Sequence, residues 1–222
     1  MAITMNIPFI VKILCPPLLF LDIIRRAFHL VFIVNICQMY HAACKKVSKP
    51  LMDEIRQFLS STKNPTVVEY GAGPYPALDA YPNGTNLIVV DPCPDFDSRL
   101  QAAWDASELS KHGTLLILTK KVEDVDPTMV ESGTVDVVVS RMANCSVTDN
   151  EITFKNVHRM LKSGGRYYFW DHVLSENPAM QIVQYIMSFP LLGLFTDCTL
   201  VRKPWELLKG CGFTDVKVNR FM

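Results

Sequence analysis

Two apolar runs are joined by a loop that contains two early glycines, and this arrangement is compatible with few folds. Thr66–Tyr70 form the first run, and Asn86–Asp91 form the second, which ends in an acidic residue. Gly71 and Gly73 closely follow the first run. Glycine at these positions permits a positive φ and lets a ligand approach the backbone closely. The pattern predicts two strands with a ligand-binding loop between them, as in nucleotide-binding α/β proteins.

Strand-like and helix-like segments alternate along the rest of the chain. Further strands are predicted at Thr114–Thr119, Val135–Ser140, Arg166–His172 and Phe213–Phe221. Helices are predicted near Pro76–Ala80 and at Ser98–Ser110, Asn150–Leu161, Ala179–Phe195 and Pro204–Lys209. The strand runs are almost continuously apolar, which is typical of strands covered on both faces. This order predicts a Rossmann-like α/β fold, with a mostly parallel sheet and helices on both faces.

The predicted helix at Asn150–Leu161 has clear signals at both ends. Thr148 and Glu151 have the spacing of a capping box, in which each side chain binds the backbone of the other. Ser163-Gly164-Gly165 follows the helix, and glycine is the usual residue beyond a helix C-terminus. We therefore expect the turn at Ser163-Gly164-Gly165 to end this helix.

The length and composition support one α/β domain with a modest appendage. The chain has 222 residues, of which 49% are apolar, and this is enough for a substantial core. We divide it into an apolar membrane-associated segment at residues 1–44, a helical lead-in and linker at residues 45–65, and the α/β domain itself at residues 66–222. No basic stripe with interleaved aromatic residues is present, which argues against a nucleic-acid partner.

The segment at residues 1–44 is a candidate membrane anchor. Crossing the hydrocarbon core takes about 20 apolar residues, whereas Pro16-Pro17 breaks the first apolar run and polar residues interrupt the second. We expect an anchor helix seated at the membrane surface or a shallow hairpin, with the lysines of residues 45–49 on the cytosolic side. The alternative is an amphipathic helix that packs on the folded domain.

The seven cysteines do not form a recognisable ligand or disulfide pattern. Their number is odd, and none stands in a C-x-x-C or Cys/His ligand spacing. This distribution fits reduced thiols facing the cytosol better than a disulfide framework. We interpret Cys145 and Cys198 as small buried residues, and we expect no metal site.

The loop after the first strand discriminates between cofactors. A dinucleotide needs backbone amides at a helix N-terminus for its pyrophosphate and a third glycine for close packing. Here Pro74 and Pro76 have no amide hydrogen, and Tyr75 stands where the third glycine is expected. S-adenosylmethionine has no phosphate and needs a close backbone and nearby acidic groups. The loop therefore favours a methyltransferase over a dehydrogenase.

Residues that follow the predicted strands are candidates for binding this cofactor. Asp91 lies 18 residues after Gly73, where a carboxylate can accept both ribose hydroxyls. Glu69 is placed near the amino-acid part, and Glu123 or Asp124 can accept the adenine amino group. For Glu123 and Asp124 an ordinary solvated loop acid is an equally good interpretation. The predicted cofactor site consists of Glu69, Gly71, Gly73, Asp91, Pro92, Glu123 and Asp124.

Five segments of the chain resemble a known family. They are Ser132–Ser140, Asn144–Val147, Val157–Arg166, Tyr168–Val173 and Asp197–Trp205. Through these segments the chain resembles the class I S-adenosylmethionine-dependent methyltransferases. More narrowly, it is similar to the membrane-anchored alkyl thiol methyltransferases, the methyltransferase-like seven family. The similarity runs from roughly Tyr40 to Val218, and the apolar N-terminal segment also fits.

The resemblance implies an activity and a location. It implies S-methylation of small lipophilic thiols at the endoplasmic reticulum membrane or the lipid-droplet surface, with the catalytic domain facing the cytosol. It also implies that Glu69, Gly71, Gly73, Asp91 and Asp124 line the cofactor site. The chain departs from the family at Pro74-Tyr75, where the family has Thr-Gly, and the family extends beyond the position of Met222. We therefore expect the terminal antiparallel strand to be missing and the sheet to end near Phe213–Phe221.

Methyl transfer to a thiol needs alignment and a way to remove the thiol proton. An ordinary thiol has a pKa near about 8.5 and is mostly protonated at neutral pH. Asp171 and His172 end the fifth predicted strand and are candidate bases. Since side chains alternate along a strand, at most one of them is expected to face the substrate. Asp197 is a third candidate. The alternatives are structural, with His172 tying strand to helix and Asp197 pairing with Arg202.

Three functions remain open from the sequence. The first is S-methylation of small lipophilic thiols, and the second is methylation of a phenol, amine or lipid acceptor. The third is a non-catalytic membrane or lipid-droplet protein that retains the fold, for which the altered loop and the missing strand are the grounds. The apolar helix predicted at Ala179–Phe195 can line a lipophilic pocket, although such spacing is more often ordinary core.

Overall fold

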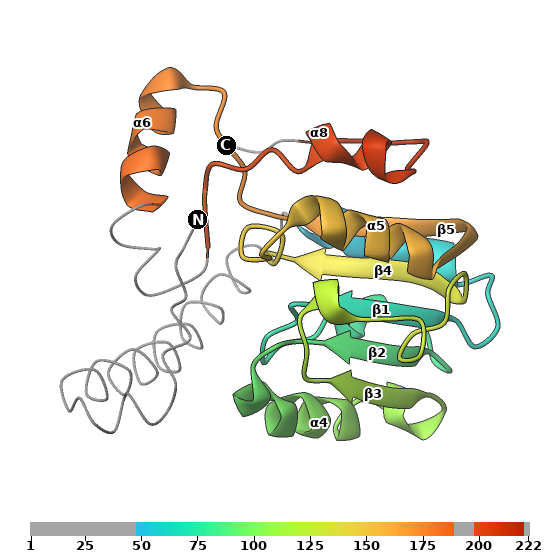
Figure 1. The fold of residues 1–222 in the computed structure, drawn as a ribbon. Helices are drawn as coiled ribbons and strands as arrows, with labels where there is room; N and C mark the ends of the chain where they lie inside the picture. The colour runs from blue at the N-terminus through green and yellow to red at the C-terminus, as the bar shows by residue number, and fades with distance from the viewer. Residues whose placement is uncertain (1–47, 189–197, 220–222) are drawn as a thin grey trace, which may run out of the picture.

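The computed structural model describes residues 48–188 and 198–219. Its centre is a parallel sheet with the strand order β3-β2-β1-β4-β5 (Figure 1). The strands are β1 (Thr66–Tyr70), β2 (Asn86–Val90), β3 (Thr114–Leu118), β4 (Val135–Arg141) and β5 (Leu161–Trp170). The predicted parallel α/β fold is confirmed, and the first four strands begin at the predicted residues. Order reverses between β1 and β4, so the two segments that follow these strands meet at the usual ligand-binding crevice.

Apolar residues on both faces of the sheet build two cores. Val67 and its neighbours on one face pack with Ile55, Leu100 and Trp104, whereas Val68 on the opposite face packs with residues that include Val157 and Met160. Adjacent strand residues thus enter different cores, because side chains of a strand alternate between its faces. This explains why β1 and β4 are almost continuously apolar, as expected for strands covered on both sides.

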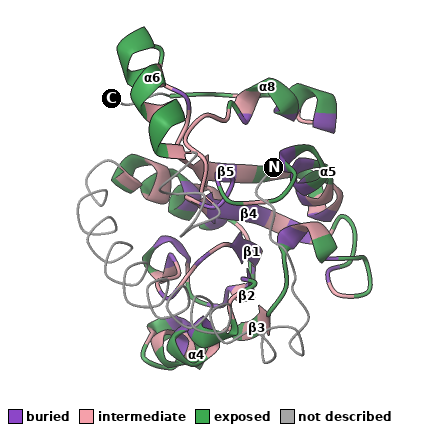
Figure 2. Cartoon of the chain, turned by 60° about the vertical axis from the view of Figure 1, so that its left-hand side comes forward, coloured by how far each residue is buried: buried purple, intermediate pink, exposed green. Residues whose placement is uncertain are grey.

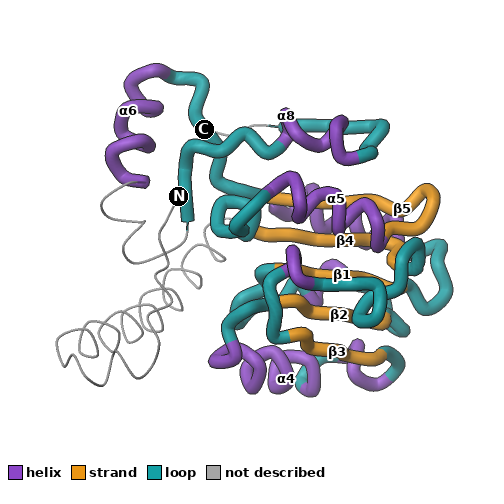
Figure 3. Tube along the Cα trace, viewed as in Figure 1, coloured by secondary structure: helices purple, strands orange, loops and turns teal. Residues whose placement is uncertain are grey.

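Helices cover both faces of the sheet (Figure 3). One core contains a helix at residues 48–59 and α4 (Asp97–Asp105), and the other packs on α5 (Asn150–Met160). Short 3-10 turns occur at Leu78–Ala80, Pro94–Phe96, Glu108–Lys111, Val122–Asp124 and Lys209–Cys211. The remaining helices are α6 (Pro178–Met187) and α8 (Trp205–Leu208). The predicted helical lead-in is thus part of the folded domain from residue 48, because Ile55 and Leu59 are completely buried.

The two ends of α5 differ from the sequence prediction. The N-cap is Asp149, whose carboxylate accepts hydrogen bonds from the backbone N–H groups of Glu151 and Ile152; Thr148 does not have this role. The helix ends at Met160, before the Ser163-Gly164-Gly165 turn. That turn lies inside β5, where the register against β4 shifts between Val135 and Val137. Gly164 has φ +77°, so the glycines form an irregularity in a strand rather than a helix stop.

The strand predicted at Phe213–Phe221 is wrong for residues 213–219, which have no strand conformation. Phe213 instead packs edge-on against His158 of α5, with ring centroids 5.4 Å apart, and also contacts Tyr167 of β5. Its apolar character therefore serves packing on one helix and one strand rather than sheet pairing. Among the described residues the sheet ends at β5, which is hydrogen-bonded to β4 only.

Helix α6 stands apart from the sheet (Figure 1), and most of its length is exposed (Figure 2). None of its residues is buried, and Ile182 and Ile186 are 62% and 61% exposed. The interpretation of this helix as ordinary core is therefore wrong for Pro178–Met187, whereas residues 189–195 lie outside the described part. No described helix is long and apolar enough to cross a bilayer. The predicted anchor at residues 1–44 lies outside the described residues.

Candidate active site

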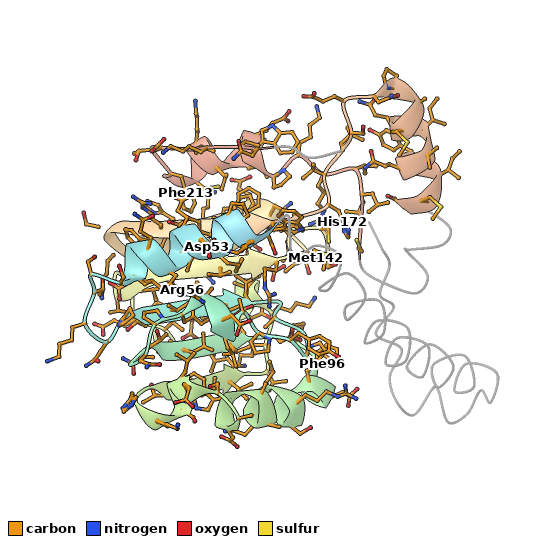
Figure 4. The ribbon with its side chains drawn as sticks, turned by 180° about the vertical axis from the view of Figure 1, so that it is seen from behind. Asp53, Arg56, Phe96, Met142, His172 and Phe213 are labelled. Atoms are coloured by element: carbon orange, nitrogen blue, oxygen red, sulfur yellow. The ribbon has the colours of Figure 1, made fainter. Side chains whose placement is uncertain are left out.

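The loops that follow β1, β2, β4 and β5 meet at the carboxyl edge of the sheet. Figure 4 shows Phe96, Met142 and His172 at this same end, although they come from different parts of the chain. Each belongs to a segment that follows one of the strands β2, β4 and β5. In parallel α/β sheets ligands bind outside this edge, at the place where the strand order reverses. The sequence-predicted cofactor and base residues lie in or beside such segments, except for Glu123 and Asp124, which follow β3, and Asp197, which is outside the described residues.

Two glycines after β1 adopt a backbone conformation that other residues rarely take. Gly71 has φ +63° and Gly73 has φ +56°. A Cβ atom at Gly71 would overlap the Cβ of Ala143, which belongs to the loop after β4. A Cβ at Gly73 would meet nothing within 4 Å. Gly71 therefore lets the two loops pack together, whereas Gly73 borders open space that a ligand can occupy.

Alanine at these two glycines should give different defects. Both substitutions place a side chain at positive φ, which costs about 1–2 kcal/mol of folding stability. Gly71→Ala should cost more, because its Cβ also displaces Ala143. Gly73→Ala should have the smaller effect on the melting temperature and the larger specific effect on cofactor affinity. Thermal unfolding and calorimetric titration with S-adenosylhomocysteine test this, and equal melting temperatures for the two variants would contradict it.

Asp91 is held in place at the end of β2. Its side chain accepts hydrogen bonds from the backbone N–H of Gly73 at 2.9 Å and from that of Cys93 at 3.0 Å. The residue is only 5% exposed. The carboxylate is therefore oriented against the glycine loop, as a ribose-binding acid must be. The adjacent Pro92 is exposed.

Glu69 has a bracing role that the sequence analysis did not predict. Its carboxylate is completely buried and forms an ion pair with Arg141, with Nη2 and Oε1 2.9 Å apart. It also accepts hydrogen bonds from the Tyr81 hydroxyl at 2.7 Å and from the backbone N–H of Ala77. These partners come from the end of β4 and from the segment after the glycine loop. Glu69 thus holds the glycine loop in place through its hydrogen bonds and its ion pair. Its contact with the amino-acid part of the cofactor stays a prediction.

The proline-flanked turn at Pro74-Tyr75 is anchored by the same network. Arg141 donates a hydrogen bond to the backbone carbonyl of Tyr75 as well as to Glu69. The next backbone N–H after Pro76, that of Ala77, is bound to Glu69. The Glu69–Arg141 pair therefore holds the turn at two points, the carbonyl of Tyr75 and the N–H of Ala77. This favours the interpretation that the prolines stiffen the turn.

The two acidic residues after β3 have different surroundings. Glu123 accepts a hydrogen bond from the backbone N–H of Thr148 at 2.6 Å, so its carboxylate supports the loop that precedes α5. Asp124 is exposed. The assignment of either residue to adenine stays a prediction.

The residues present fit an adenosine-containing methyl donor. Open space at Gly73 allows close backbone approach, and the Asp91 carboxylate beside it is the acceptor that a ribose diol requires. Glu69, Gly71, Gly73 and Asp91 would hold the cofactor around this loop, with Glu69 acting through the backbone it braces. S-adenosylmethionine supplies a methyl group on a positively charged sulfur when it is bound.

Asp171 and His172 lie just beyond β5, which ends at Trp170 rather than at His172. The Asp171 carboxylate accepts hydrogen bonds from the backbone N–H groups of Asn144 and Cys145, at 3.1 and 3.0 Å. Burial raises the pKa of Asp171 to about 6. Asp171 thus positions the loop after β4. The alternation of side chains along a strand does not apply to these two residues, because β5 ends before them. Which of them faces the substrate stays a prediction.

His172 lies in a cluster with two cysteines that sequence spacing did not reveal. Its Nδ1 is 3.6 Å from the Cys198 Sγ. The ligand atoms of Cys145, His172 and Cys198 all lie within 4.8 Å of one another. A hydrogen bond with the Cys145 side chain raises the pKa of His172. The strand order places the ends of β4 and β5 side by side and so brings Cys145 and His172 together. The Thr199 N–H, which donates to the Cys145 carbonyl, holds the segment of Cys198 beside them.

This fold and site define a class I S-adenosylmethionine-dependent methyltransferase, an enzyme. A family model described as a methyltransferase domain matches residues 44–195. The chain belongs to this methyltransferase-domain family.

Two human proteins are similar to the chain at low sequence identity. Thiol S-methyltransferase TMT1A is 25% identical over 189 residues, which cover 85% of this chain and 76% of that protein. Thiol S-methyltransferase TMT1B is 23% identical over 173 residues, or 78% of this chain and 69% of that protein. These identities support the methyltransferase family.

A solved structure confirms the fold independently. Haemonchus contortus phosphoethanolamine N-methyltransferase 2, in complex with S-adenosylmethionine, superposes with a TM-score of 0.55 at 15% identity. The match covers 72% of this chain and 36% of that one, so this chain spans about a third of the larger protein.

Proposed function

We propose that this methyltransferase acts on the thiol sulfur of small lipophilic acceptors. The observation that carries the proposal is the position of the His172 imidazole, beside Cys198 and on the edge where the loop after β4 packs on the glycine loop. A proton-accepting group is required there, because a neutral thiol is a weak nucleophile. The similarity to proteins named thiol S-methyltransferases supports sulfur as the acceptor atom.

The chain's own residues have separable tasks in this reaction. Asp91 and the glycine loop orient the methyl donor, and the Glu69–Arg141 pair keeps that loop in place. Asp171 fixes the backbone of the loop after β4, and His172 takes the acceptor proton at its imidazole. The acceptor sulfur then needs only to lie in line with the methyl group, since alignment supplies much of the rate.

The location of the enzyme is a second part of the proposal. We infer that it acts at the endoplasmic reticulum membrane or the lipid-droplet surface, with the catalytic domain facing the cytosol. The apolar composition of residues 1–44 and the exposed apolar side chains of α6 support this. Flotation of the full chain with membranes after a carbonate wash tests it, and recovery in the soluble fraction would contradict it.

Matched acceptors test the substrate class. Benzenethiol, phenol and aniline have one ring and differ in the acceptor atom, so their rates compare sulfur, oxygen and nitrogen at similar size. With the membrane-bound enzyme and labelled S-adenosylmethionine, we expect kcat/KM for the thiol to exceed that of the other two by at least about 100-fold, or about 2.7 kcal/mol. A higher value for phenol or aniline would favour the O- or N-acceptor alternative.

A further inference from the structure

Three potential metal ligands converge beside the proposed acceptor site. Cys145 follows β4, His172 follows β5, and Cys198 begins the second described range. Their ligand atoms all lie within 4.8 Å of one another, and the Cys198 Sγ is 3.6 Å from the His172 Nδ1. In tetrahedral zinc sites with Zn–S bonds of about 2.3 Å, two sulfur ligands lie about 3.8 Å apart. The cluster is therefore close to the spacing that a bound zinc ion imposes.

We propose that Cys145, His172 and Cys198 bind a zinc ion whose fourth ligand is the acceptor thiol. Thiolate and imidazole ligands select zinc among the common divalent cations, since calcium and magnesium prefer oxygen ligands. Three protein ligands with one open position are the arrangement of catalytic rather than structural zinc sites. The identity of the fourth ligand rests on the proposed function, whereas zinc binding by the three side chains does not.

The backbone around the three side chains is fixed before any ion binds. Asp171 accepts hydrogen bonds from the N–H groups of Asn144 and Cys145. The N–H of Thr199 donates to the Cys145 carbonyl at 2.9 Å, so the segments that carry the two cysteines are joined directly. Arg202 donates to the Asn144 carbonyl at 2.8 Å. Such supporting bonds are typical of metal sites, where they orient the ligands.

The cluster is also next to the loop that receives the methyl donor. Ala143, two residues before Cys145, packs so closely on Gly71 that only glycine fits there. A thiol bound at the open position would therefore lie near the reactive end of a donor seated on the glycine loop.

The proposed chemistry balances without an oxidant or a reductant. Zinc binding releases the protons of the Cys145 and Cys198 thiols to solvent, and the acceptor thiol loses its proton when it binds the ion. A sulfur lone pair then forms the new carbon–sulfur bond to the methyl group. The sulfonium carbon–sulfur bond breaks, and its electron pair stays on the sulfur of S-adenosylhomocysteine. The neutral thioether product is a weak ligand and leaves. In the metal-loaded enzyme His172 is a ligand, so coordination replaces it in removing the thiol proton.

The test measures metal binding by the full chain, purified in detergent with reductant. We expect about one zinc per chain and, after exchange, a thiolate-to-cobalt charge-transfer band. Cys145→Ser, Cys198→Ser and His172→Ala should each weaken zinc binding by at least about 10-fold. Cys211→Ser is the matched control, because Cys211 is a buried thiol outside the cluster, and it should bind zinc normally. Absence of zinc binding, unchanged binding in the three variants, or a Cys145–Cys198 disulfide that persists in the protein purified with reductant would overturn the site.

A chelation experiment separates this proposal from the proposed function. Removal of zinc should lower thiol methylation by at least about 10-fold, and added zinc should restore it. Full thiol methylation by the metal-free enzyme would overturn the role of zinc and leave the thiol substrate standing. Specific zinc binding without methylation of any thiol would overturn the proposed function and the fourth ligand, but not the three-residue site.

Discussion

Asp91→Ala is expected to weaken binding of S-adenosylmethionine by at least about 100-fold. The Asp91 carboxylate is buried and oriented by the N–H groups of Gly73 and Cys93. Hydrogen bonds to a charged group contribute about 1.5–3 kcal/mol each, so losing two ribose contacts costs about 3–6 kcal/mol of binding free energy. Each 1.4 kcal/mol or so is about tenfold in affinity. Isothermal titration calorimetry with S-adenosylmethionine and S-adenosylhomocysteine measures this loss.

Two further variants show whether the weaker binding of Asp91→Ala comes from the loss of the ribose contacts. Asp95→Ala removes a neighbouring acidic residue that is exposed, and it should bind the cofactor normally. Asp91→Asn retains a carbonyl oxygen that can accept one hydrogen bond, so its affinity should be intermediate. Circular dichroism should show that each variant is folded at the titration temperature. An unchanged dissociation constant for a folded Asp91→Ala protein would rule out the ribose assignment.

Glu69→Ala is expected to lower the free energy of unfolding by about 3–5 kcal/mol, because it leaves the positive charge of Arg141 without its buried partner. The Glu69 side chain is 0% exposed and that of Arg141 is 15% exposed, so solvent screens the pair weakly. The substitution also removes the acceptor for Tyr81 and Ala77. The melting temperature should fall by about 10 °C for a domain of this size. Thermal and urea unfolding measure both quantities.

A double substitution separates the charge pair from the hydrogen bonds around it. Glu69→Ala with Arg141→Met removes both charges, so it should be more stable than Glu69→Ala alone. Ser175→Ala is the control, and its free energy of unfolding should stay close to that of the unsubstituted protein. Ser175 is distant in sequence from the glycine loop and carries no charge. A loss below about 1 kcal/mol for Glu69→Ala would contradict the bracing role of the pair.

The sequence predicted the sheet well where strands are apolar on both faces. Val67 and Val68 enter opposite cores, which gives β1 a continuous apolar run that pattern analysis recognises. The prediction from sequence failed where tertiary contacts override local signals. Ser163-Gly164-Gly165 resembles a helix stop but forms an irregularity in β5, and Phe213 resembles part of a strand but packs on His158. Neither outcome is encoded in the neighbouring residues.

The positions of candidate residues were predictable where they depend on lying after a strand. The structure brings Gly73 and Asp91 together through a hydrogen bond, at the ends of the two strands where the sequence placed them. The partners of Glu69 were not predictable, since Arg141 is 72 residues away in sequence. The Cys145–His172–Cys198 cluster was missed for the same reason. Its members match no short ligand spacing, and they meet only through the pairing of β4 with β5 and the later packing of the Cys198 segment on Cys145.

A substrate that carries both a thiol and a phenol shows directly which atom the enzyme methylates. The membrane-bound enzyme is incubated with S-adenosylmethionine carrying a deuterated methyl group and with 4-mercaptophenol, which offers sulfur and oxygen on one ring. Mass spectrometry and NMR identify the methylated atom, and the Asp91→Ala variant gives the background. We expect deuteromethyl transfer to sulfur, at least about 100-fold above that background. Transfer to oxygen, or no transfer above the variant, would contradict it.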